Sequence, residues 1–226
     1  NVSNTNISNN KITDSFYGVW LNQSSNATIY KNTLLSYTTG VYCYYDVNTI
    51  INENKISNGQ TGIYCYYTTG DAIRRNTISY NTRYGAKSYN STLKNCFNWN
   101  YFSNNTISYS YDPSQPLSTM LFDGNIIKDS IIGVEVRDAS TIILSNNIIA
   151  RNEKGILVSN ASPEIKENYV RVNEDGIFLE NGSNPVINKN NIFGNSKFGI
   201  ENEDPSITAN AMQNWWGKVP PIQSAT

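Results

Sequence analysis

The sequence predicts an all-β solenoid of about ten coils, with about 22 residues and three short strands in each coil. The first observation behind this prediction is an Asn that is followed two places later by an apolar residue and recurs along the whole chain. The second is a Gly that precedes a mostly aliphatic residue with nearly the same period. The third is an apolar residue three places before each Asn. A fixed period of this length indicates stacked repeats.

The recurring Asn marks a turn between the first and second strands of each coil. It occurs at Asn10, Asn32, Asn54, Asn76, Asn105, Asn125, Asn147, Asn168, Asn190 and Asn210. Asn tolerates the left-handed backbone of a tight turn, and its amide can donate to and accept from the Asn one coil away. We therefore expect a ladder of amides that satisfies itself inside the body. The expected structural ladder comprises Asn32, Asn54, Asn76, Asn105, Asn125, Asn147, Asn168 and Asn190.

The recurring Gly marks a second turn, ahead of the third strand. It occurs at Gly18, Gly40, Gly62, Gly85, Gly133, Gly155, Gly176 and Gly199. We expect Gly here because a positive φ costs it little. Side chains alternate along a strand, so the first and third residues after each Gly should face the core and the second and fourth should face outward. Stacking would pair every strand in parallel with the next coil and bury one continuous core.

The repeat falters at residues 86–132, which we treat as irregular, loop-bearing coils. The interval from Gly85 to Asn105 is longer than in other coils, so we expect about six residues to bulge out around Cys96–Tyr101. The next coil lacks its Gly, and residues 112–116 contain two prolines that favour a loop. Loops on a rigid scaffold are where function tends to lie.

We expect residues 1–226 to form a single domain that is a piece of a longer chain, because the sequence starts in the middle of a repeat. Residues 211–226 should form a C-terminal cap, in which Trp215 and Trp216 cover the last coil and the prolines at 220 and 221 stop further pairing. The N-terminal coil has no such cover, which favours assembly at that end.

The repeats resemble a known family. The segments GVEVRDASTIILSNNIIARNEK (133–154) and GIFLENGSNPVINKNNIFGNSKF (176–198) are similar to right-handed parallel β-helix repeats of the NosD-like, carbohydrate-binding and sugar-hydrolase type. The closing NWWG at 214–217 is similar to the usual end of such domains. The resemblance implies a right-handed parallel β-helix of the kind common in surface proteins of methanogenic archaea. It leaves the function open among lyases, hydrolases, epimerases and plain surface proteins.

Composition limits the classes of function that the chain could have. The net charge of −1 gives no electrostatic footprint for nucleic acid, and no apolar run is long enough to span a membrane. Eight Asn-x-Ser/Thr sequons suit a glycosylated extracellular protein, although a chain with 36 Asn also forms sequons by chance. The glycosylation candidates are Asn22, Asn26, Asn90, Asn104, Asn160 and Asn181.

The three cysteines fit neither a disulfide framework nor a C-x-x-C metal motif. Strand alternation places Cys43 and Cys65 in the core, one coil apart, as two buried thiols or, alternatively, as a disulfide between coils. Copper, a role of NosD-like relatives, requires His, Met or Cys ligands, and a chain with no His and two Met is poorly suited to it. We expect no cofactor. Calcium is the one ion that we retain as a possible ligand. It needs six to eight oxygen ligands, and only Asp46 and Asp71 are acidic residues near the expected site.

The outward positions after each Gly form an aromatic wall in the first half of the chain. Its members, taken as ligand-binding candidates, are Trp20, Tyr42, Tyr44, Tyr64, Tyr66 and Tyr89. Flat rings with hydroxyl tips suit sugar faces, and contiguous exposed patches of this kind mark binding sites. A contact with another subunit, or simple packing between adjacent strands, would favour the same ring-rich columns.

The same outward positions are charged in the second half of the chain. Glu180 and Glu203 would stack one coil apart, about the separation of a retaining glycosidase, with Arg137 on the same column. Asp71 with Arg74 and Arg75 would instead suit a lyase. If the carboxylates converge in a groove with Arg137, an enzyme gains support.

These observations favour a non-enzymatic extracellular or cell-surface domain with a structural or adhesive role. It would bind a glycan, or associate with itself into filaments or sheets, through the aromatic wall. The alternative is a polysaccharide lyase or glycoside hydrolase that acts on the same face.

Overall fold

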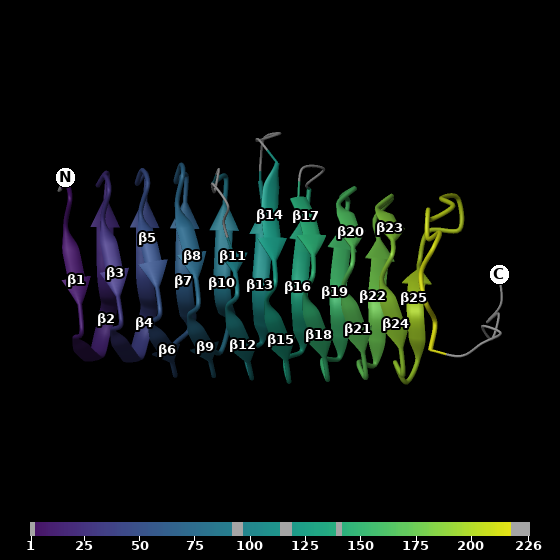
Figure 1. The fold of residues 1–226 in the computed structure, drawn as a ribbon, viewed down its shortest axis with the longest axis horizontal. Coiled ribbons are helices and arrows are strands. Elements are labelled where there is room, and N and C mark those ends of the chain that lie inside the picture. Colours follow the sequence, from purple (N-terminus) through teal and green to yellow (C-terminus); the bar gives the residue numbers. More distant parts are fainter. Residues whose placement is uncertain (1–2, 92–96, 114–118, 139–141, 218–226) are drawn as a thin grey trace.

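The computed structural model describes residues 3–91, 97–113, 119–138 and 142–217. Every regular element in these ranges is a β-strand, and none of the described residues form a helix long and apolar enough to cross a membrane. The strands stack coil upon coil into a rod, with the N-terminus at one end and β25 near the other (Figure 1). The predicted solenoid of parallel strands is therefore confirmed.

The strand that precedes the Asn turn builds a nine-stranded parallel sheet. In stacking order its strands are β1 (Asn6–Ser8), β3 (Thr28–Tyr30), β5 (Ile50–Asn52), β8 (Ala72–Arg74), β11 (Phe97–Asn98), β14 (Met120–Asp123), β17 (Ile142–Ser145), β20 (Glu164–Lys166) and β23 (Val186–Asn188). An isolated parallel bridge joins Val186 to Asn210 beyond the last strand. The nine strands correspond to nine coils, and the bridge marks a partial tenth, so the observed number differs from the expected ten by at most one.

The other two strands of each coil form a sixteen-stranded sheet. The row that follows the Asn turn contains β6 (Lys55–Ser57), β9 (Thr77–Ser79), β12 (Tyr101–Ser103), β15 (Ile126–Lys128), β18 (Ile148–Ala150), β21 (Tyr169–Arg171) and β24 (Asn191–Phe193). The row that follows the Gly contains β7 (Thr61–Tyr66), β10 (Tyr84–Tyr89), β13 (Ile107–Asp112), β16 (Ile132–Arg137), β19 (Lys154–Ser159), β22 (Asp175–Glu180) and β25 (Phe198–Asn202). The long strands β2 (Lys11–Asn22) and β4 (Thr33–Tyr44) run through both rows and join them into one sheet.

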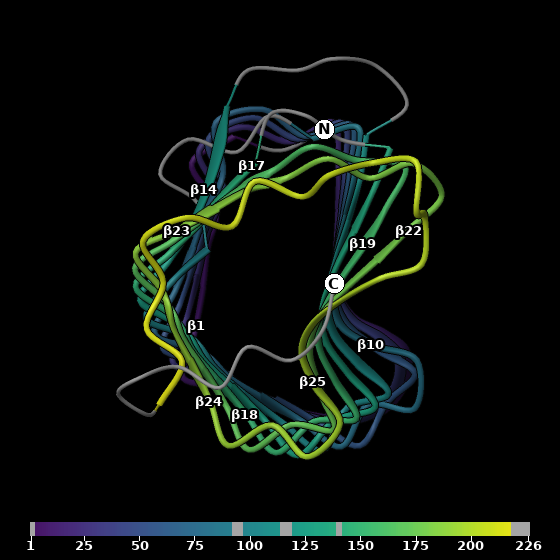
Figure 2. The ribbon, with the colours of Figure 1, turned by 90° about the vertical axis from the view of Figure 1, so that its right-hand side faces the viewer.

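Seen along its axis, the rod is a closed coil whose outline is indented where the row after the Gly runs, beside β10, β19 and β22 (Figure 2). Each coil contributes apolar side chains from all three strands to one continuous core. The inward positions after each Gly, such as Val41, Ile63 and Val134, are fully buried as predicted. The outward positions therefore align in register along the rod.

The Asn ladder is continuous but includes Asn100 in place of Asn105. The Oδ1 of Asn100 accepts from the backbone N–H and the side-chain amide of Asn76, and its own amide donates to Asn125. Phe97 pairs with residues in both adjacent coils, so the residues from Phe97 to Tyr101 lie in register and do not bulge out. The prediction for Asn105 was wrong because this coil has a second Asn-x-apolar motif five residues later. Cys96 lies outside the described residues.

Asn105 belongs to a second ladder at the turn between the other two strands. It accepts from Asn81 at 3.0 Å, and the same pattern runs through Asn152 and Asn173 to Asn195. The first ladder also ends differently from the prediction: Asn190 donates to Asn214, not to Asn210. The chain thus uses two amide ladders, and their similar motifs cannot be distinguished by period alone.

The residue with left-handed backbone is not the ladder Asn but the one before it. These residues are Asn9, Lys31, Glu53, Arg75, Trp99, Gly124, Asn146, Glu167, Lys189 and Gln213, with φ between 54° and 66°. The Asn therefore serves through its amide, which is buried and must be satisfied inside the body.

The Gly column also has a different physical cause from the predicted one. None of its eight glycines is among those with positive φ, which are Gly70, Gly124, Gly182, Gly194 and Gly217. A Cβ on Gly155 would lie 2.5 Å from the carbonyl oxygen of Gly176 and 2.9 Å from the amide nitrogen of Asn173. Gly is needed because successive coils approach too closely for a side chain.

At the C-terminal end, Trp216 packs against the core and lies over Gly199, as the cap prediction requires. Trp215 is 44% exposed and contacts Phe193 edge to face, so it covers less of the coil than predicted. The predicted prolines of the cap lie outside the described residues.

Candidate functional site

The outer face of β4, β7 and β10 carries a tyrosine array arranged in three columns. The array consists of Tyr17, Tyr42 and Tyr64, then Tyr44, Tyr66 and Tyr89, then Tyr45 and Tyr67. Rings within a column stack with centroids 5.0–5.5 Å apart, close to one coil spacing. Parallel register aligns Tyr42 with Tyr64, and Tyr44 with Tyr66 and Tyr89, whereas Tyr17 on β2 is in register with Thr39.

Five of the six predicted ligand-binding residues lie in this array, and Trp20 does not. Trp20 is 56% exposed and contacts Tyr17, while Tyr17 takes the place beside Tyr42. The alternation rule missed Tyr17 because it precedes the Gly. It also missed Tyr45 and Tyr67, which directly follow the strand ends.

Tyr45 and Tyr67 have left-handed backbone, with φ of 53° at each. Other coils place Asn90, Asn160 and Asn181 in the same conformation at the strand end. A bulky side chain is unfavourable in this region, by roughly 1–2 kcal/mol, whereas Asn tolerates it. The turn therefore does not require Tyr, and such local strain is typical of functional positions.

A groove of about 250 Å³ opens beside the array. Tyr17, Tyr42 and Tyr64 line it together with Arg83 and Lys87. Lys87 forms an ion pair with Asp112 at 3.4 Å, and among the described residues Arg83 has no ion-pair partner. The groove combines aromatic faces with a cationic rim.

Tyr42, Tyr64 and Tyr66 of the array are neutral near neutral pH. Burial raises the pKa of Tyr64 to about 12, with the neighbouring tyrosines as a further cause. Burial followed by the same ring neighbours also raises the pKa of Tyr42 and Tyr66. The hydroxyls are therefore available as hydrogen-bond donors and acceptors, not as anions.

The second half of the same face is charged but largely covered. Glu135 is 4% exposed and accepts from the Ser110 hydroxyl at 2.8 Å and from Arg137 Nε at 2.9 Å. Phe178 is also buried, with the Lys154 Nζ 3.2 Å from its ring centroid. These outward positions lie in the indentation of the rod, where flanking side chains cover them.

The charged candidates converge only in part. Arg137 forms an ion pair with Glu135, and its Nη1 also lies 3.9 Å from Oε1 of Glu180. These three side chains therefore form one cluster. Glu201 instead pairs with Lys197, and Glu203 is exposed. The cluster thus contains Glu135, which was not among the catalytic candidates, in place of Glu203.

The predicted lyase group is not assembled. Asp71 is fully buried, whereas Arg74 and Arg75 are exposed. Asp71 points inward because its Oδ1 accepts the backbone N–H of Thr49 at 2.8 Å. Asp46 is buried in the same way by a bond from Ser24 at 2.7 Å, so the two carboxylates predicted for calcium lie in the core.

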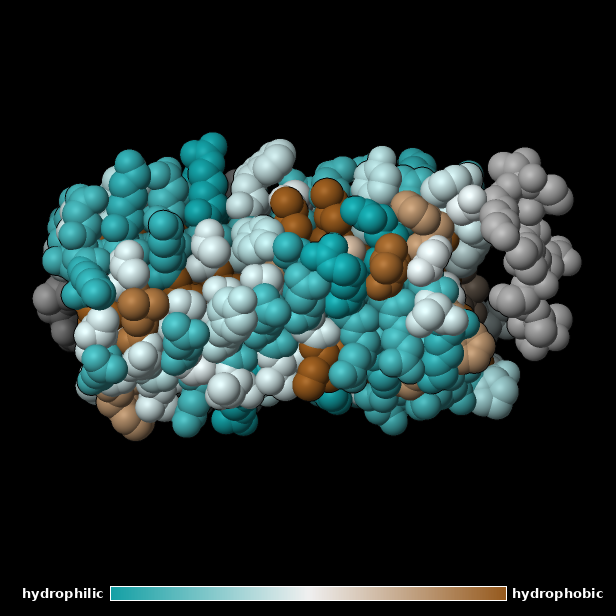
Figure 3. All heavy atoms as spheres, turned by 90° about the horizontal axis from the view of Figure 1, so that it is seen from below, coloured by the Kyte–Doolittle hydropathy of each residue, from teal (hydrophilic) through white to brown (hydrophobic). Residues whose placement is uncertain are grey.

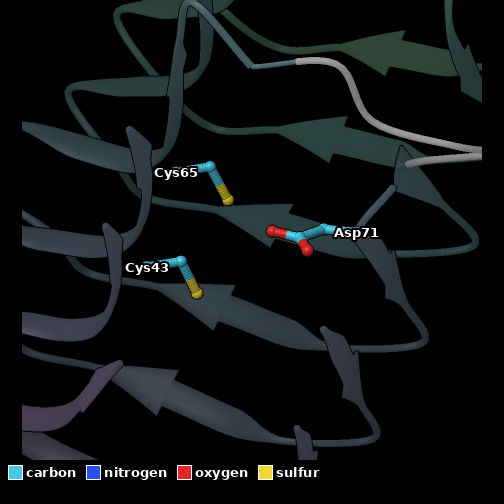
Figure 4. Close-up of side chains that lie close together, drawn as sticks. All are labelled: Cys43, Cys65 and Asp71. Atoms are coloured by element: carbon cyan, nitrogen blue, oxygen red, sulfur yellow. The ribbon is translucent and has the colours of Figure 1, made fainter. Parts of the chain in front are cut away.

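The core of these coils contains a sulfur–carboxyl cluster made of Cys43, Cys65 and Asp71. One donor atom from each lies within 4.8 Å of the others, and the Asp71 carboxyl points toward the two sulfurs (Figure 4). Both cysteines are free thiols, so the structure contains buried thiols, not the alternative disulfide. Sequence alternation placed the two thiols together but gave no signal for Asp71.

The glycosylation candidates differ in accessibility. Asn22, Asn26, Asn104, Asn160 and Asn181 are exposed. Asn90 is only 7% exposed, so it is a poor acceptor for a glycan.

A second, larger hollow of about 890 Å³ follows the turns between the second and third strands of several coils. Asn104 and Glu174 line it, together with an Arg151–Asp129 pair whose bonds are 2.7 and 3.0 Å. Sequence patterns gave no indication of this hollow. Its cation is already paired, unlike Arg83.

Two family models match the chain. The model described as periplasmic copper-binding protein (NosD) matches residues 1–120, and the model described as right handed beta helix region matches residues 98–214. No curated protein matches the chain in sequence.

Solved structures with the same fold include alginate-modifying enzymes. The structure is similar to a periplasmic alginate epimerase, AlgG, with a TM-score of 0.74 and 15% identity over 85% of this chain and 51% of that one. It is also similar to the mannuronan C-5 epimerase AlgE6 A-module of Azotobacter vinelandii, with a TM-score of 0.75 and 16% identity over 95% of this chain and 70% of that one. The chain thus spans about half the length of the first of these enzymes.

Proposed function

The chain belongs to the NosD family and to the right-handed β-helix family, and we propose that it is a glycan-binding domain located outside the cytoplasm. The ligand is an acidic polysaccharide that lies along the tyrosine array. The observation that carries this proposal is the groove that Tyr42, Tyr64 and Arg83 line together.

The chemistry of the groove supports this ligand class. Stacked rings present flat apolar faces with hydroxyl rims, which suit the faces and hydroxyls of sugars. A guanidinium without an ion-pair partner suits a carboxylate, which it can bind through two parallel hydrogen bonds. The array extends over successive coils, so it suits a polymer and not a single sugar.

The named activities of similar structures agree with this class of ligand. The similar solved structures include alginate and mannuronan epimerases, and these polymers are acidic polysaccharides. The NosD family and the similar alginate epimerase are both described as periplasmic, which supports a location in the periplasm or outside the cell.

The test is direct binding of mannuronan and of a neutral glucan of the same length, measured by calorimetry. We expect mannuronan to bind and the neutral polymer to bind at least tenfold more weakly, because it cannot pair with Arg83. Tyr64→Thr and Arg83→Gln should each weaken mannuronan binding by about tenfold, equivalent to about 1.4 kcal/mol.

Matched controls lie elsewhere on the rod. Tyr169 is exposed on β21 and Lys55 is exposed on β6, so Tyr169→Thr and Lys55→Gln should leave binding unchanged. Equal effects of the control and test variants, or equal binding of both polymers, would refute the proposal.

An enzyme is the second candidate, and the cluster of Glu135, Arg137 and Glu180 is the observation that favours it. Incubated mannuronan would then be shortened or altered in its sugar composition, and Glu180→Gln would abolish the change. A third outcome is self-association through the array, which sedimentation would detect as a mass that rises with protein concentration.

A further inference from the structure

An exposed tryptophan lies outside both the tyrosine array and the charged cluster. Trp99 is in the turn between β11 and β12 and is 65% exposed. This row of turns lies across the coil from β10, whose row carries the array (Figure 2). The backbone of Trp99 is left-handed, with φ of 60°. The equivalent turn residues of other coils are polar or glycine, so the turn itself does not require a large ring in an unfavourable conformation.

One face of the Trp99 ring lies on the adjacent coil. A Cβ placed on Gly124 would lie 3.3 Å from Cδ2 and 3.4 Å from both Cε2 and Cε3 of Trp99. A point that is almost equally far from three atoms of the six-membered ring lies above the ring plane, so the indole lies flat over Gly124. Because the side chain is largely exposed, its other face is open to solvent. An open indole face held against the backbone is a platform on which the apolar face of a sugar can stack.

Two exposed arginines lie beside this platform, on the preceding coil. Arg74 is the register partner of Asn98, and the backbone N–H of Arg75 donates to the carbonyl oxygen of Asn98 at 3.2 Å. Among the described residues neither arginine forms an ion pair. Glu53, which has the same turn position one coil earlier, pairs with Lys31 at 3.7 Å. The two guanidinium groups are therefore available for an anion, and a guanidinium can bind a carboxylate through two parallel hydrogen bonds.

The charges on the two sides of the platform differ in sign. Arg74, Asn98 and Asp123 are successive partners in the register of β8, β11 and β14. The Oδ1 of Asp123 accepts from the Ser145 hydroxyl at 2.7 Å and from the Asn146 amide at 2.8 Å, so this carboxylate is held in place. A ligand on the indole would meet cations on the preceding coil and a fixed carboxylate on the following coil. This arrangement fits a sugar that directs its own carboxylate to the arginines and its hydroxyls to Asp123.

We infer that Trp99, Arg74 and Arg75 form a second carbohydrate site, which binds a single uronate residue. The sugar stacks on the open indole face, and its carboxylate pairs with the guanidinium groups. The site offers one ring where the array offers several, so we expect it to bind at least tenfold more weakly than the array binds a polymer. The inference does not depend on the array, because the two sites share no residue.

The test is a titration of the isotope-labelled full chain with methyl glucuronide and with methyl glucoside, followed by nuclear magnetic resonance. The two sugars differ only in that one bears a carboxylate where the other bears a hydroxymethyl group. The four tryptophans give separate indole N–H signals, and Trp99→Asn identifies one of them. We expect glucuronide to shift the Trp99 signal and glucoside to require at least a fivefold higher concentration. Trp20 contacts Tyr17 and reports on the array, whereas Trp216 packs against the core and is an internal control.

The variants separate the charge of the site from its ring. Arg75→Gln keeps the ring and removes one guanidinium, so glucuronide binding at Trp99 should weaken at least fivefold while glucoside binding stays the same. Lys189→Gln is the matched control, because Lys189 is exposed at the same turn position of a later coil. Equal losses in these two variants would overturn the inference, since the effect would then be one of net charge. Trp99→Asn introduces a residue that this turn accepts at Asn146, so Tm should stay within about 3 °C of the parent.

Failure of this site and failure of the array give different results. Tyr64→Thr/Arg83→Gln should lose the response at Trp20 and keep the response at Trp99. A Trp99 signal that glucuronide does not shift, or that both sugars shift equally, would overturn the inference whatever happens at Trp20. If Trp99→Asn fails to fold, Arg75→Gln decides the matter, because it leaves the ring and its backbone in place.

Discussion

At the residue scale, the tyrosines with left-handed backbone allow the contribution of a side chain to ligand binding to be measured apart from its contribution to stability. Tyr67 occupies a conformation that Asn adopts at the equivalent strand end in other coils. Tyr67→Asn removes a strain of roughly 1–2 kcal/mol and loses a ring contact of similar size. We expect the free energy of unfolding to change by less than about 1 kcal/mol, while mannuronan binding weakens at least fivefold.

The measurements are urea denaturation and calorimetry on the same preparation. Tyr80 supplies the control, since it is also left-handed and exposed but lies outside the array. Tyr80→Asn should show the same small stability change with full binding. A loss of stability in Tyr67→Asn large enough to explain its weaker binding would contradict this prediction.

Asp71 makes the stability of the folded protein depend on pH, with a sign that follows from its burial. Burial raises the pKa of this carboxyl from 3.8 to about 7. Below pH 3.8 both the folded and unfolded states bind the proton, and between there and about 7 only the folded state keeps it. Stability is therefore greatest at low pH and falls as pH rises through about 7.

We expect the reduced protein to be more stable near pH 5 than near pH 8, by up to about 3 kcal/mol from this group. Asp71→Asn keeps an oxygen that accepts from Thr49 and has no proton to lose, so most of this difference should disappear. Urea denaturation at both pH values measures it, with the exposed Asp14→Asn as control. An unchanged pH difference in Asp71→Asn would show that Asp71 is ionised throughout this range.

At the scale of elements, the amide ladder is the main polar support of the coil stack. The Asn100 side chain accepts two bonds from Asn76 and donates to the carbonyl of Ile73 and to Asn125. Asn100→Ala would leave these buried partners unsatisfied. We expect a loss of at least about 3 kcal/mol in unfolding free energy.

Thermal and urea denaturation of Asn100→Ala would measure this loss. The control is Asn184→Ala, since Asn184 is exposed and only its backbone bonds the adjacent coil. A loss below about 1 kcal/mol in Asn100→Ala would mean that water replaces the amide within the stack.

The strands and their facing directions could be predicted from the sequence because a period of 22 and a period of 2 are both visible in it. The sequence could not show that Asn100, and not Asn105, belongs to the first ladder. Both residues have the same Asn-x-apolar motif, and they differ only in the turn of the coil at which they lie. The Gly column was predicted for the wrong reason, because close approach of backbones leaves the same residue preference as a positive φ.

The sites were less predictable than the strands. Strand alternation correctly aligned Tyr42, Tyr44, Tyr64, Tyr66 and Tyr89, since β-register transmits one sequence position to the next coil. It could not place residues that precede the Gly or lie outside the strands. Tyr17 reaches the array from before the Gly, and Asp71 turns inward through a single backbone bond.

At the scale of the whole molecule, the rod has two distinct halves on one side. The aromatic array belongs to the N-terminal coils, and the paired charges of Glu135, Arg137 and Glu180 belong to later coils. The face seen from below is mostly hydrophilic, with hydrophobic side chains in small separate patches (Figure 3). Small patches of this kind do not make a large apolar interface, so this face gives no support to sheet-like association.

The length of the array makes a prediction about ligand size. Three coil intervals separate Tyr17 from Tyr89, which is on the order of 15 Å along the rod. Affinity for mannuronan oligomers should rise with length until the oligomer covers this distance and then level off, because further sugars find covered, paired charges. Added salt should weaken binding moderately, as only one or two cations face the ligand. Calorimetry with a series of oligomers measures both effects, and affinity that keeps rising well beyond this length would place the binding surface along the whole rod and not on the array.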